Sequence, residues 1–274
     1  MSLHTTEIQF TGSQGSALAA SLDEPDQGAH AFALFAHCFT CNKDVFAASR
    51  ISRELTSSGI AVLRFDFTGL GASDGDFSTT TFSSNVTDLV MAADHLRQRY
   101  SAPRVLIGHS LGGAAVLAAT HLIPEARAVA TIGAPADPEH VLHLLSGSQD
   151  AINEAGAAEV TIGRRSFLIR KEFLEDIAQQ PQAERISSLR TALMVMHSPT
   201  DDVVGIDNAR RIFDLARHPK SFISLDGADH LITRHRDARY AATVLGAWAA
   251  RYAFDQQTAR PGHDHERHHQ RVAT

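Results

Sequence analysis

The chain has 274 residues, of which 43% are apolar, and it carries a formal charge of −6 at pH 7. This length and apolar content suffice for one large α/β domain with a substantial core. An acidic chain without clustered Lys and Arg lacks the surface that captures nucleic acid electrostatically. We therefore expect no nucleic-acid partner and a small-molecule substrate instead.

Two features of the sequence bear on where the protein resides. The N-terminus, MSLHTTEIQF, lacks a cationic stretch followed by an apolar one, and no run of about eighteen uncharged apolar residues occurs. We expect no membrane partner and a cytoplasmic location. The two cysteines, Cys38 and Cys41, are too few for a disulfide framework, which agrees with a reducing compartment.

Short apolar runs alternate with amphipathic stretches, a pattern typical of parallel strands joined by crossover helices. The pattern predicts strands near residues 7–10, 17–22, 31–36, 60–65, 104–108, 128–132, 191–197 and 221–225. It predicts helices near residues 44–57, 83–99, 110–121, 206–216 and 236–254. GSQG joins the first two strands too tightly for a crossover helix, so we expect the sheet to begin antiparallel and continue parallel.

Two segments lie outside this regular alternation. Residues 136–190 are too long for a simple connection and contain helical patterns, so we predict a small helical cap between core segments 1–135 and 191–255. The polar segment 256–274 carries histidines at positions 263, 265, 268 and 269. We predict a disordered tail there, with weak metal binding as the alternative, because no scaffold fixes those imidazoles. We expect no metal site.

The segment Gly108-His109-Ser110-Leu111-Gly112 follows an apolar strand and opens an alanine-rich helix. A serine lifted clear of a strand end needs a tight turn, and side chains at Gly108 or Gly112 would collide with neighbouring backbone. The helix N-terminus favours an oxyanion nearby. Ser110 is therefore the candidate nucleophile, and an N-cap serine between flexible glycines is the alternative.

A serine nucleophile needs a base, and a carboxylate that orients the base. His230 follows the last predicted strand in a glycine-containing loop, and histidine changes charge in the appropriate pH range. His235 and His109 are weaker candidates for the base. At the end of the strand TALMVMH, Asp201 and Asp202 both qualify as the carboxylate, and the dipeptide alone does not decide between them.

Acyl transfer also needs two backbone N–H groups that hold the oxyanion. One comes from the residue after the nucleophile, Leu111, and the second from the loop after the third strand, where Phe39 is the expected donor. Cys38 and Cys41 in the same loop make a thioredoxin-type dithiol a competing function, and oxidation that modulates the oxyanion hole another. A dithiol leaves the serine and its partners unexplained, so we expect two buried, inert thiols.

Over residues 5–254 the chain resembles the α/β-hydrolase superfamily, through AHCFTC, FDFTGLGASDG, GHSLGG, HSPTDDVV and GADH in that order. The resemblance implies an α/β-hydrolase fold, with a mostly parallel eight-stranded sheet and helices on both faces. In the family's acid motif the aspartate stands four residues after a histidine, here His197, which selects Asp201. The sequence departs from the motif at Ser198, where glycine is usual.

A narrower resemblance is carried by AHCFTCNKD, HSPTDDVVGIDNA and HPKSFISLDGADHL. These segments resemble the hydrolase half of proteins that fuse a hydrolase to an OsmC-like peroxide-resistance domain. No such domain follows in this sequence, so we expect no peroxidase chemistry. The segment FDFTGLGASDG is expected to shape a turn beside the site, with Asp66, Gly69 and Gly71 as structural residues.

Together these features predict a serine hydrolase that cleaves a small carboxylic ester or related acyl compound through an acyl-enzyme, without a cofactor. The catalytic residues would be Ser110, His230 and Asp201. A serine at position 110 argues against dehalogenase or epoxide hydrolase chemistry, which this fold performs through aspartate. A peptidase or thioesterase would use the same triad, and a thiol redox protein or a non-enzymatic binding module is a further alternative. We expect a monomer or homodimer.

Overall fold

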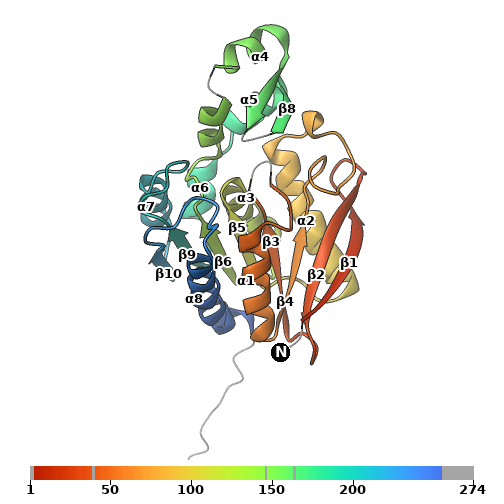
Figure 1. Ribbon diagram of the computed structural model, residues 1–274, viewed down its shortest axis with the longest axis vertical. Helices are drawn as coiled ribbons and strands as arrows, with labels where there is room; N and C mark the ends of the chain where they lie inside the picture. Colours follow the sequence, from red (N-terminus) through yellow and green to blue (C-terminus); the bar gives the residue numbers. More distant parts are fainter. Residues whose placement is uncertain (1–2, 39–40, 146, 163–164, 255–274) are drawn as a thin grey trace, which may run out of the picture.

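The computed structural model describes residues 3–38, 41–145, 147–162 and 165–254. Eight strands form one sheet in the order β1 (Leu3–Thr11), β2 (Ala17–Pro25), β4 (Ile60–Phe65), β3 (Ala31–Ala36), β5 (Val105–His109), β6 (Ala128–Ile132), β9 (Ala192–His197) and β10 (Lys220–Ser224) (Figure 1). Strand β2 runs antiparallel to both its neighbours, and the remaining pairs are parallel. The predicted mostly parallel sheet is confirmed.

The predicted antiparallel start of the sheet is also confirmed. The N–H of Gly12 donates to the carbonyl of Ser16 at 2.9 Å and closes the turn between β1 and β2. Gly15 has a φ of +80°, in the left-handed region that favours glycine. The tight GSQG turn therefore leaves no room for a crossover helix.

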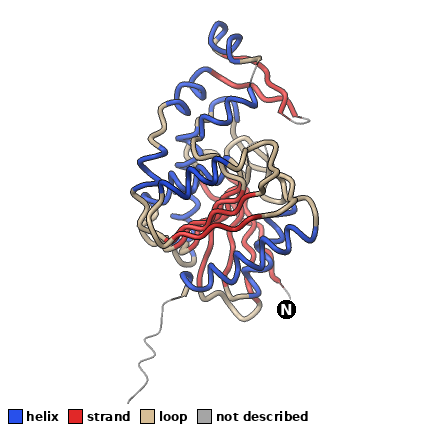
Figure 2. Tube along the Cα trace, turned by 90° about the vertical axis from the view of Figure 1, so that its left-hand side faces the viewer, coloured by secondary structure: helices blue, strands red, loops and turns tan. Residues whose placement is uncertain are grey.

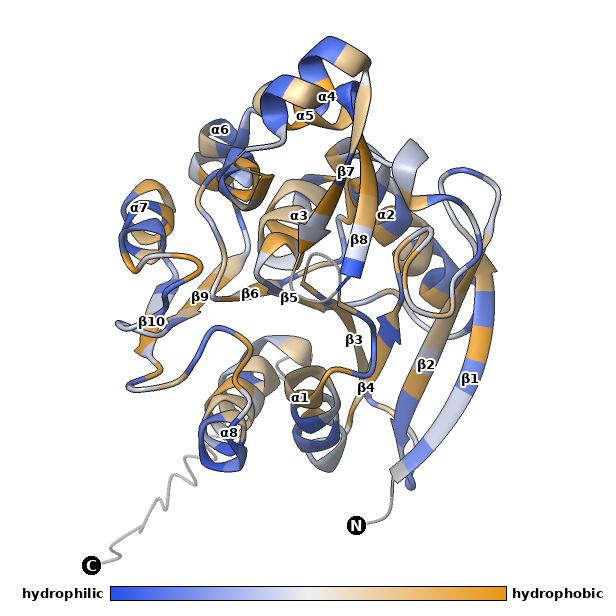
Figure 3. Ribbon diagram, turned by 45° about the horizontal axis from the view of Figure 1, so that its top comes forward, coloured by the Kyte–Doolittle hydropathy of each residue, from blue (hydrophilic) through white to orange (hydrophobic). Residues whose placement is uncertain are grey.

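Helices cover both faces of the sheet (Figure 3). On one face lie α1 (Phe46–Ser57) and α8 (His235–Ala253), and on the other α2 (Phe82–Arg99), α3 (Leu111–Ala119) and α7 (Asp207–Leu215). Every residue of the central strands β3, β4, β5, β6 and β9 is buried. Strands covered on both faces are expected to be largely apolar, which explains runs such as AFALFA and IAVL.

The segment between β6 and β9, which we call the insertion, differs from the prediction. It contains η3 (Pro138–Leu145), α4 (Gln149–Ala155), β7 (Ala157–Ile162), β8 (Arg165–Arg170), α5 (Lys171–Ala178) and α6 (Gln182–Ser187). Strands β7 and β8 pair antiparallel and lie apart from the main sheet, at one end of the molecule (Figure 2). The expected helical cap therefore holds a hairpin as well. Most of its residues are at least partly exposed, which weakens the alternating apolar pattern that identifies a strand.

Short 3-10 turns complete the fold, η1 (Phe77–Thr79) before α2 and η2 (Thr120–Leu122) after α3. Across the described parts of the chain, no helix has both the length and the apolar character that crossing a bilayer requires. The histidine-rich tail predicted for residues 256–274 lies outside the described residues.

Candidate active site

Ser110 stands in the sharp turn between β5 and α3. Its φ of +55° and ψ of −125° lie in a region that non-glycine residues rarely occupy. The N–H of Ser110 donates to the carbonyl of Ile132 at 2.8 Å, and the N–H of Gly113 donates to the carbonyl of Ser110 at 2.8 Å. Backbone bonds from the neighbouring strand and from the helix therefore hold this strained residue in place, as is found at functional sites.

The glycines on either side of the turn permit very close backbone approaches. A Cβ atom on Gly108 would lie 2.2 Å from the carbonyl oxygen of Gly112. A Cβ atom on Gly112 would lie 2.3 Å from the carbonyl oxygen of His37. Any larger residue at either position would push α3 away from β5 or from the loop after β3, and would move Ser110 with it.

The side chains of Ser110, His230 and Asp201 form a continuous hydrogen-bonded chain. Nε2 of His230 lies 3.0 Å from Oγ of Ser110, and Nδ1 lies 2.8 Å from Oδ2 of Asp201. If Nδ1 carries the proton that it donates to the carboxylate, Nε2 accepts from the serine hydroxyl. The three residues follow β5, β9 and β10, and parallel strands bring their carboxyl ends to one edge of the sheet.

The carboxylate of Asp201 is buried and accepts several hydrogen bonds. Its Oδ1 accepts the N–H of Val203 at 3.0 Å and that of Val204 at 2.9 Å. Burial raises the pKa of Asp201, but the hydrogen bonds from His230 and from these two N–H groups outweigh it and hold the pKa below its usual value. The carboxylate therefore stays charged at neutral pH. Asp202, the rival candidate, is exposed.

His235, the other candidate base in this region, is exposed at the start of α8. Its ring contacts the ring of Phe46 edge-on, with centroids 4.6 Å apart. The structure thus brings His230 to Ser110 and leaves His235 against α1.

Two buried histidines support the site through backbone carbonyls. Nε2 of His109 donates to the carbonyl of His230 at 2.7 Å, and Nε2 of His197 donates to the carbonyl of Val204 at 2.7 Å. Burial lowers the pKa of both, and the neighbouring His230 adds to this effect, so that the pKa of His109 falls to about 4. At neutral pH both rings are uncharged. They hold the loops that carry the base and the acid, a role that the sequence did not reveal.

Gly133, which follows β6, is a further residue that sequence reasoning missed. Its φ is +54°, and a Cβ atom there would lie 3.3 Å from Oδ2 of Asp201 and 3.4 Å from Nδ1 of His230. The backbone of Gly133 therefore packs directly against the bonded pair. A glycine at the end of a predicted strand was the available signal, but glycine is common at such ends.

Of the two expected oxyanion donors, the structure describes Leu111. Leu111 is the first residue of α3, so its N–H has no acceptor within the helix and is free to bond an oxyanion. Phe39 lies outside the described residues.

Asp66 joins the loop after β3 to the loop after β4. Its Oδ1 accepts the N–H of Lys43 at 2.5 Å, and its Oδ2 accepts the N–H of Ala72 at 2.9 Å. A Cβ atom on Gly71 would lie 2.2 Å from Asp66 Oδ2, and one on Gly69 would lie 2.2 Å from the backbone nitrogen of Phe77. These contacts agree with the structural roles expected for Asp66, Gly69 and Gly71.

Cys38 and Cys41 form a disulfide, so the prediction of two free thiols is wrong. The N–H of Cys41 donates to the carbonyl of Cys38 at 3.1 Å, and this turn brings the Cα atoms within 5.3 Å, a separation that a disulfide spans. Sequence spacing alone does not reveal such a turn. The argument from free cysteines to a reducing compartment is lost, and the cytoplasmic location stays a prediction.

Within the described ranges, no group of three or more His, Cys, Asp or Glu side chains is arranged to hold a metal ion.

Comparisons with known proteins identify the family. Residues 33–273 match the model of the alpha/beta hydrolase family. The chain belongs to this family. The esterase domain of a Rhodothermus marinus protein is 49% identical to this hydrolase, with a TM-score of 0.75, and the alignment covers 92% of this chain and 100% of that domain. The predicted α/β-hydrolase fold is thereby confirmed.

Curated relatives of this hydrolase match over shorter segments. Human palmitoyl-protein thioesterase ABHD10, mitochondrial, is 39% identical over 77 residues, which are 28% of this chain and 24% of the human protein. The mouse protein is 31% identical over 100 residues, and the match spans 32% of its length. The structure of mouse alpha/beta hydrolase domain-containing protein 10 has a TM-score of 0.72, covering 90% of this chain and 99% of that one. At 20% identity it shows a shared fold alone.

Proposed function

We propose that this hydrolase cleaves a small carboxylic ester, with Ser110 as nucleophile, His230 as base and Asp201 as the carboxylate that orients the base. The observation that carries the proposal is the pair of hydrogen bonds, 3.0 Å from Ser110 to His230 and 2.8 Å from His230 to Asp201. The 49% identical esterase domain supports an ester as the substrate class.

In the first half of the reaction, Nε2 of His230 takes the hydroxyl proton of Ser110 while Oγ bonds to the acyl carbon. The carbonyl oxygen becomes an oxyanion, held by the N–H of Leu111 and, as we propose, that of Phe39. When the oxyanion collapses, the bond to the leaving oxygen breaks and His230 gives its proton to the departing alcohol. Ser110 is then acylated.

In the second half, His230 takes a proton from water, whose oxygen attacks the acyl carbon of the ester on Ser110. Collapse of the second oxyanion releases the carboxylic acid and returns the proton to Oγ of Ser110. Throughout both halves, the charged carboxylate of Asp201 holds the ring in the tautomer that accepts from Ser110 and stabilises the imidazolium that forms.

Labelling with a fluorophosphonate, followed by mass spectrometry of the adduct, tests the nucleophile. We expect the label on Ser110 and expect Ser110→Ala to abolish both the label and the hydrolysis of p-nitrophenyl esters. Ser57→Ala, which changes an exposed serine on α1, should keep both. A label at another residue, or full esterase activity in Ser110→Ala, would contradict the proposal.

A thioesterase is the second candidate, because the curated relatives that match part of this chain are named palmitoyl-protein thioesterases. In a thioesterase, Ser110 would attack the carbonyl carbon of the thioester, with His230 as base and Asp201 as the orienting carboxylate. The p-nitrophenyl ester and the coenzyme A thioester of butyrate carry the same acyl group, so their kcat/KM values compare the two functions directly. A larger kcat/KM for the thioester would replace the ester proposal with this one.

Two further alternatives are tested with a third substrate and with variants. A peptidase would cleave the p-nitroanilide of the same acyl group with a comparable kcat/KM. A thiol redox protein would keep its activity in Ser110→Ala and lose it in Cys38→Ser. The narrower resemblance to hydrolases fused to an OsmC-like domain stays a prediction.

A further inference from the structure

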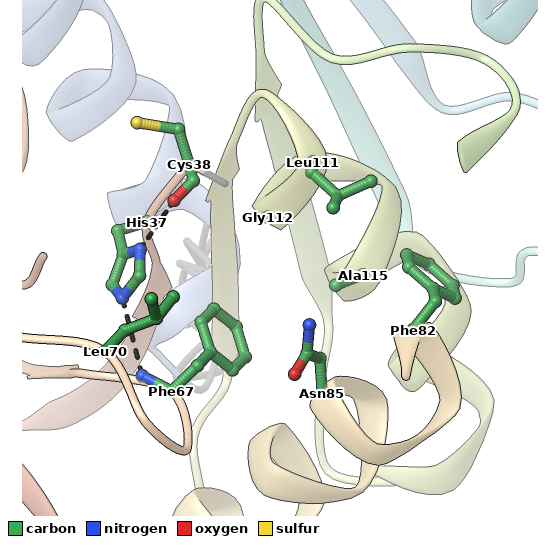
Figure 4. A pocket seen from close by; sticks show the side chains of 9 residues that line it. All are labelled: His37, Cys38, Phe67, Leu70, Phe82, Asn85, Leu111, Gly112 and Ala115. Atoms are coloured by element: carbon green, nitrogen blue, oxygen red, sulfur yellow. Dashed lines mark hydrogen bonds between the residues drawn. The ribbon is translucent and has the colours of Figure 1, made fainter. Parts of the chain in front are cut away.

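Two loops at the carboxyl edge of the sheet are fixed in different ways. In the loop after β3, the buried ring of His37 donates from Nδ1 to the carbonyl of Cys38 at 2.7 Å, and its Nε2 accepts the N–H of Phe67 at 3.4 Å (Figure 4). Hydrogen bonds of a buried side chain therefore help to hold that loop. The loop after β10, which carries His230, contains a backbone outlier.

The outlier is Ile232, two residues after the base, with a φ of +52°. Among the described residues, Ser110 and Ile232 are the two non-glycine residues that have a positive φ. A β-branched residue rarely adopts this conformation, because its Cβ atom crowds the neighbouring backbone. Such strain persists only where the surrounding structure enforces it, and it is concentrated at functional sites. The two strained residues are thus the candidate nucleophile and a close neighbour of the base.

Two interactions hold Ile232 in this conformation. Its side chain is only 2% exposed and belongs to the buried cluster between the sheet and the helices α1 and α8. Its N–H donates to the carbonyl of Asp229 at 3.0 Å. Leu231, the residue between Ile232 and the base, is 49% exposed and gives the loop no comparable anchor.

The hydrogen bond from Ile232 to Asp229 closes a β-turn in which His230 and Leu231 are the central residues. The carbonyl of His230 accepts Nε2 of His109 at 2.7 Å. The base therefore lies in a turn that is fixed at its own carbonyl and at its closing residue, Ile232.

The residue after Ile232 is also tied to this turn. The N–H of Thr233 donates to Oδ1 of Asp229 at 3.0 Å, and the hydroxyl of Thr233 donates to Oδ2 of the same carboxylate. If the φ of Ile232 became negative, either these bonds would break or the side chain of Ile232 would leave the core. Both changes would move the turn that carries His230.

We infer that Ile232 is a positioning residue, whose left-handed backbone and buried side chain together place His230 within hydrogen-bonding distance of Ser110 and Asp201. The inference rests on the proposed function, in which His230 is the base. It predicts an order of activities that packing alone does not: glycine at position 232 should give a more active enzyme than alanine, although glycine fills less space. Glycine adopts a positive φ at no steric cost, whereas alanine there favours a relaxed backbone.

Steady-state kinetics on p-nitrophenyl acetate test this order, at a temperature at which thermal melts show each variant to be folded. Ile232→Ala removes the anchor and keeps the strain, so kcat should fall by about 10- to 100-fold, as expected when a reacting group is displaced, with KM within about twofold. Ile232→Gly removes the anchor and the strain together, so its kcat should exceed that of Ile232→Ala by at least about threefold. Ile232→Val keeps a buried branched side chain and should stay within about threefold of wild type.

Leu245→Ala is the matched control, because Leu245 is fully buried in the same cluster but lies in the regular helix α8. It should lower the melting temperature and leave the kcat of the folded protein near that of wild type. If Ile232→Ala is unfolded at the assay temperature, Thr233→Val takes its place. This change at an exposed position removes the hydroxyl bond to Asp229 and should lower kcat by about three- to tenfold. Its control is Thr161→Val, at an exposed threonine whose hydroxyl lies 3.1 Å from that of Ser166 in the hairpin.

The outcomes separate this inference from the proposed function. If hydrolysis of the acetate ester does not depend on Ser110, or if His230→Ala keeps the wild-type kcat, the proposed function fails and the inference with it. If both residues are required but folded Ile232→Ala keeps the wild-type kcat, or Ile232→Gly is the less active of the two variants, the inference alone is overturned. Where Thr233→Val takes the place of Ile232→Ala, a kcat within about twofold of wild type overturns it as well.

Discussion

The insertion packs against α2 and α3 beside the carboxyl edge of the sheet, yet the two regions are built in different ways. At the edge, Asp201 and His230 are buried and bonded to backbone groups as well as to each other. In the two described strands of the insertion, only Val160 and Ile169 are buried. The reacting groups therefore belong to the dense part of the core, whereas the hairpin of the insertion lies largely at the surface.

Apolar packing attaches the insertion to the core, since Phe173, Leu174 and Ile177 of α5 are buried in one cluster with α2 and α3, and a few polar contacts add to it. Asp176 on α5 accepts the N–H of Ser83 at 2.9 Å and its hydroxyl at 2.5 Å. Nε2 of Gln182 on α6 donates to the carbonyl of Ala114 in α3 at 2.9 Å. If the comparison between the two regions is correct, changes at the edge alter the chemical step, whereas changes in the insertion alter stability or the choice of substrate.

The largest effect is expected from the acid. Asp201→Asn removes the charge that holds the tautomer of His230, so kcat should fall by about 10⁴-fold. Asp202→Asn, a change of the exposed neighbour, should leave kcat within about twofold of wild type, as expected for a solvated surface charge. Steady-state kinetics on p-nitrophenyl acetate measure both. Equal losses in the two variants would break the assignment of Asp201.

Gly133 and Gly156 test the comparison directly, because both have a positive φ, +54° at the edge and +80° in the insertion. Gly133→Ala places a methyl group 3.3 Å from Oδ2 of Asp201, and displacing the pair should lower kcat by about 10- to 100-fold. Gly156→Ala meets nothing within 4 Å, so it should cost about 1 kcal/mol of stability through its backbone and leave kcat unchanged. A similar kcat in both variants would contradict the expected difference between the sheet edge and the insertion.

The pH dependence of folding tests the buried histidines of the edge. Burial and the neighbouring His230 lower the pKa of His109 to about 4, whereas an unfolded histidine titrates near about 6.5. Between these pH values the unfolded chain binds a proton that the folded chain does not. The free energy of unfolding should therefore fall as the pH drops from about 6.5 to about 4, by up to about 3 kcal/mol from this site.

His109→Gln should make that pH dependence shallower, and urea denaturation at a series of pH values measures it. His121→Gln changes an exposed histidine and is the control, which should keep the wild-type slope. If His109→Gln has the wild-type slope, the neutral buried ring does not contribute to acid sensitivity.

The smallest effect is expected at the attachment of the insertion. Asp176→Ala removes the bonds to Ser83, and since these groups are exposed we expect KM for p-nitrophenyl octanoate to change by only about two- to threefold. The kcat for acetate should not change. Glu175→Ala on the same helix breaks a pair with Lys171 inside α5 and serves as the control. A loss of kcat for acetate in Asp176→Ala would show that the insertion also holds the reacting groups.

The sequence was informative wherever a feature is local. The strand β3 is a continuous apolar run, and β4 and β9 are apolar except for Arg64 and His197. Ser110 stands near Gly108 and Gly112 because a Cβ atom at either glycine would collide with the backbone of a neighbouring segment. The hairpin of the insertion was missed because its partly exposed strands have little apolar alternation. The disulfide was missed because a spacing of three residues fits both free and bonded cysteines.

By itself the sequence determined the order of the strands and helices of the core, the turn at Ser110 and the candidates for base and acid, since each depends on neighbours along the chain. Only the tertiary structure decided which of those candidates meet. It brings Asp201 rather than Asp202 to His230, packs Gly133 against that pair and directs His109 to the carbonyl of His230. Contacts between residues far apart in the chain depend on how strands and loops converge at the sheet edge, and no local pattern encodes that convergence.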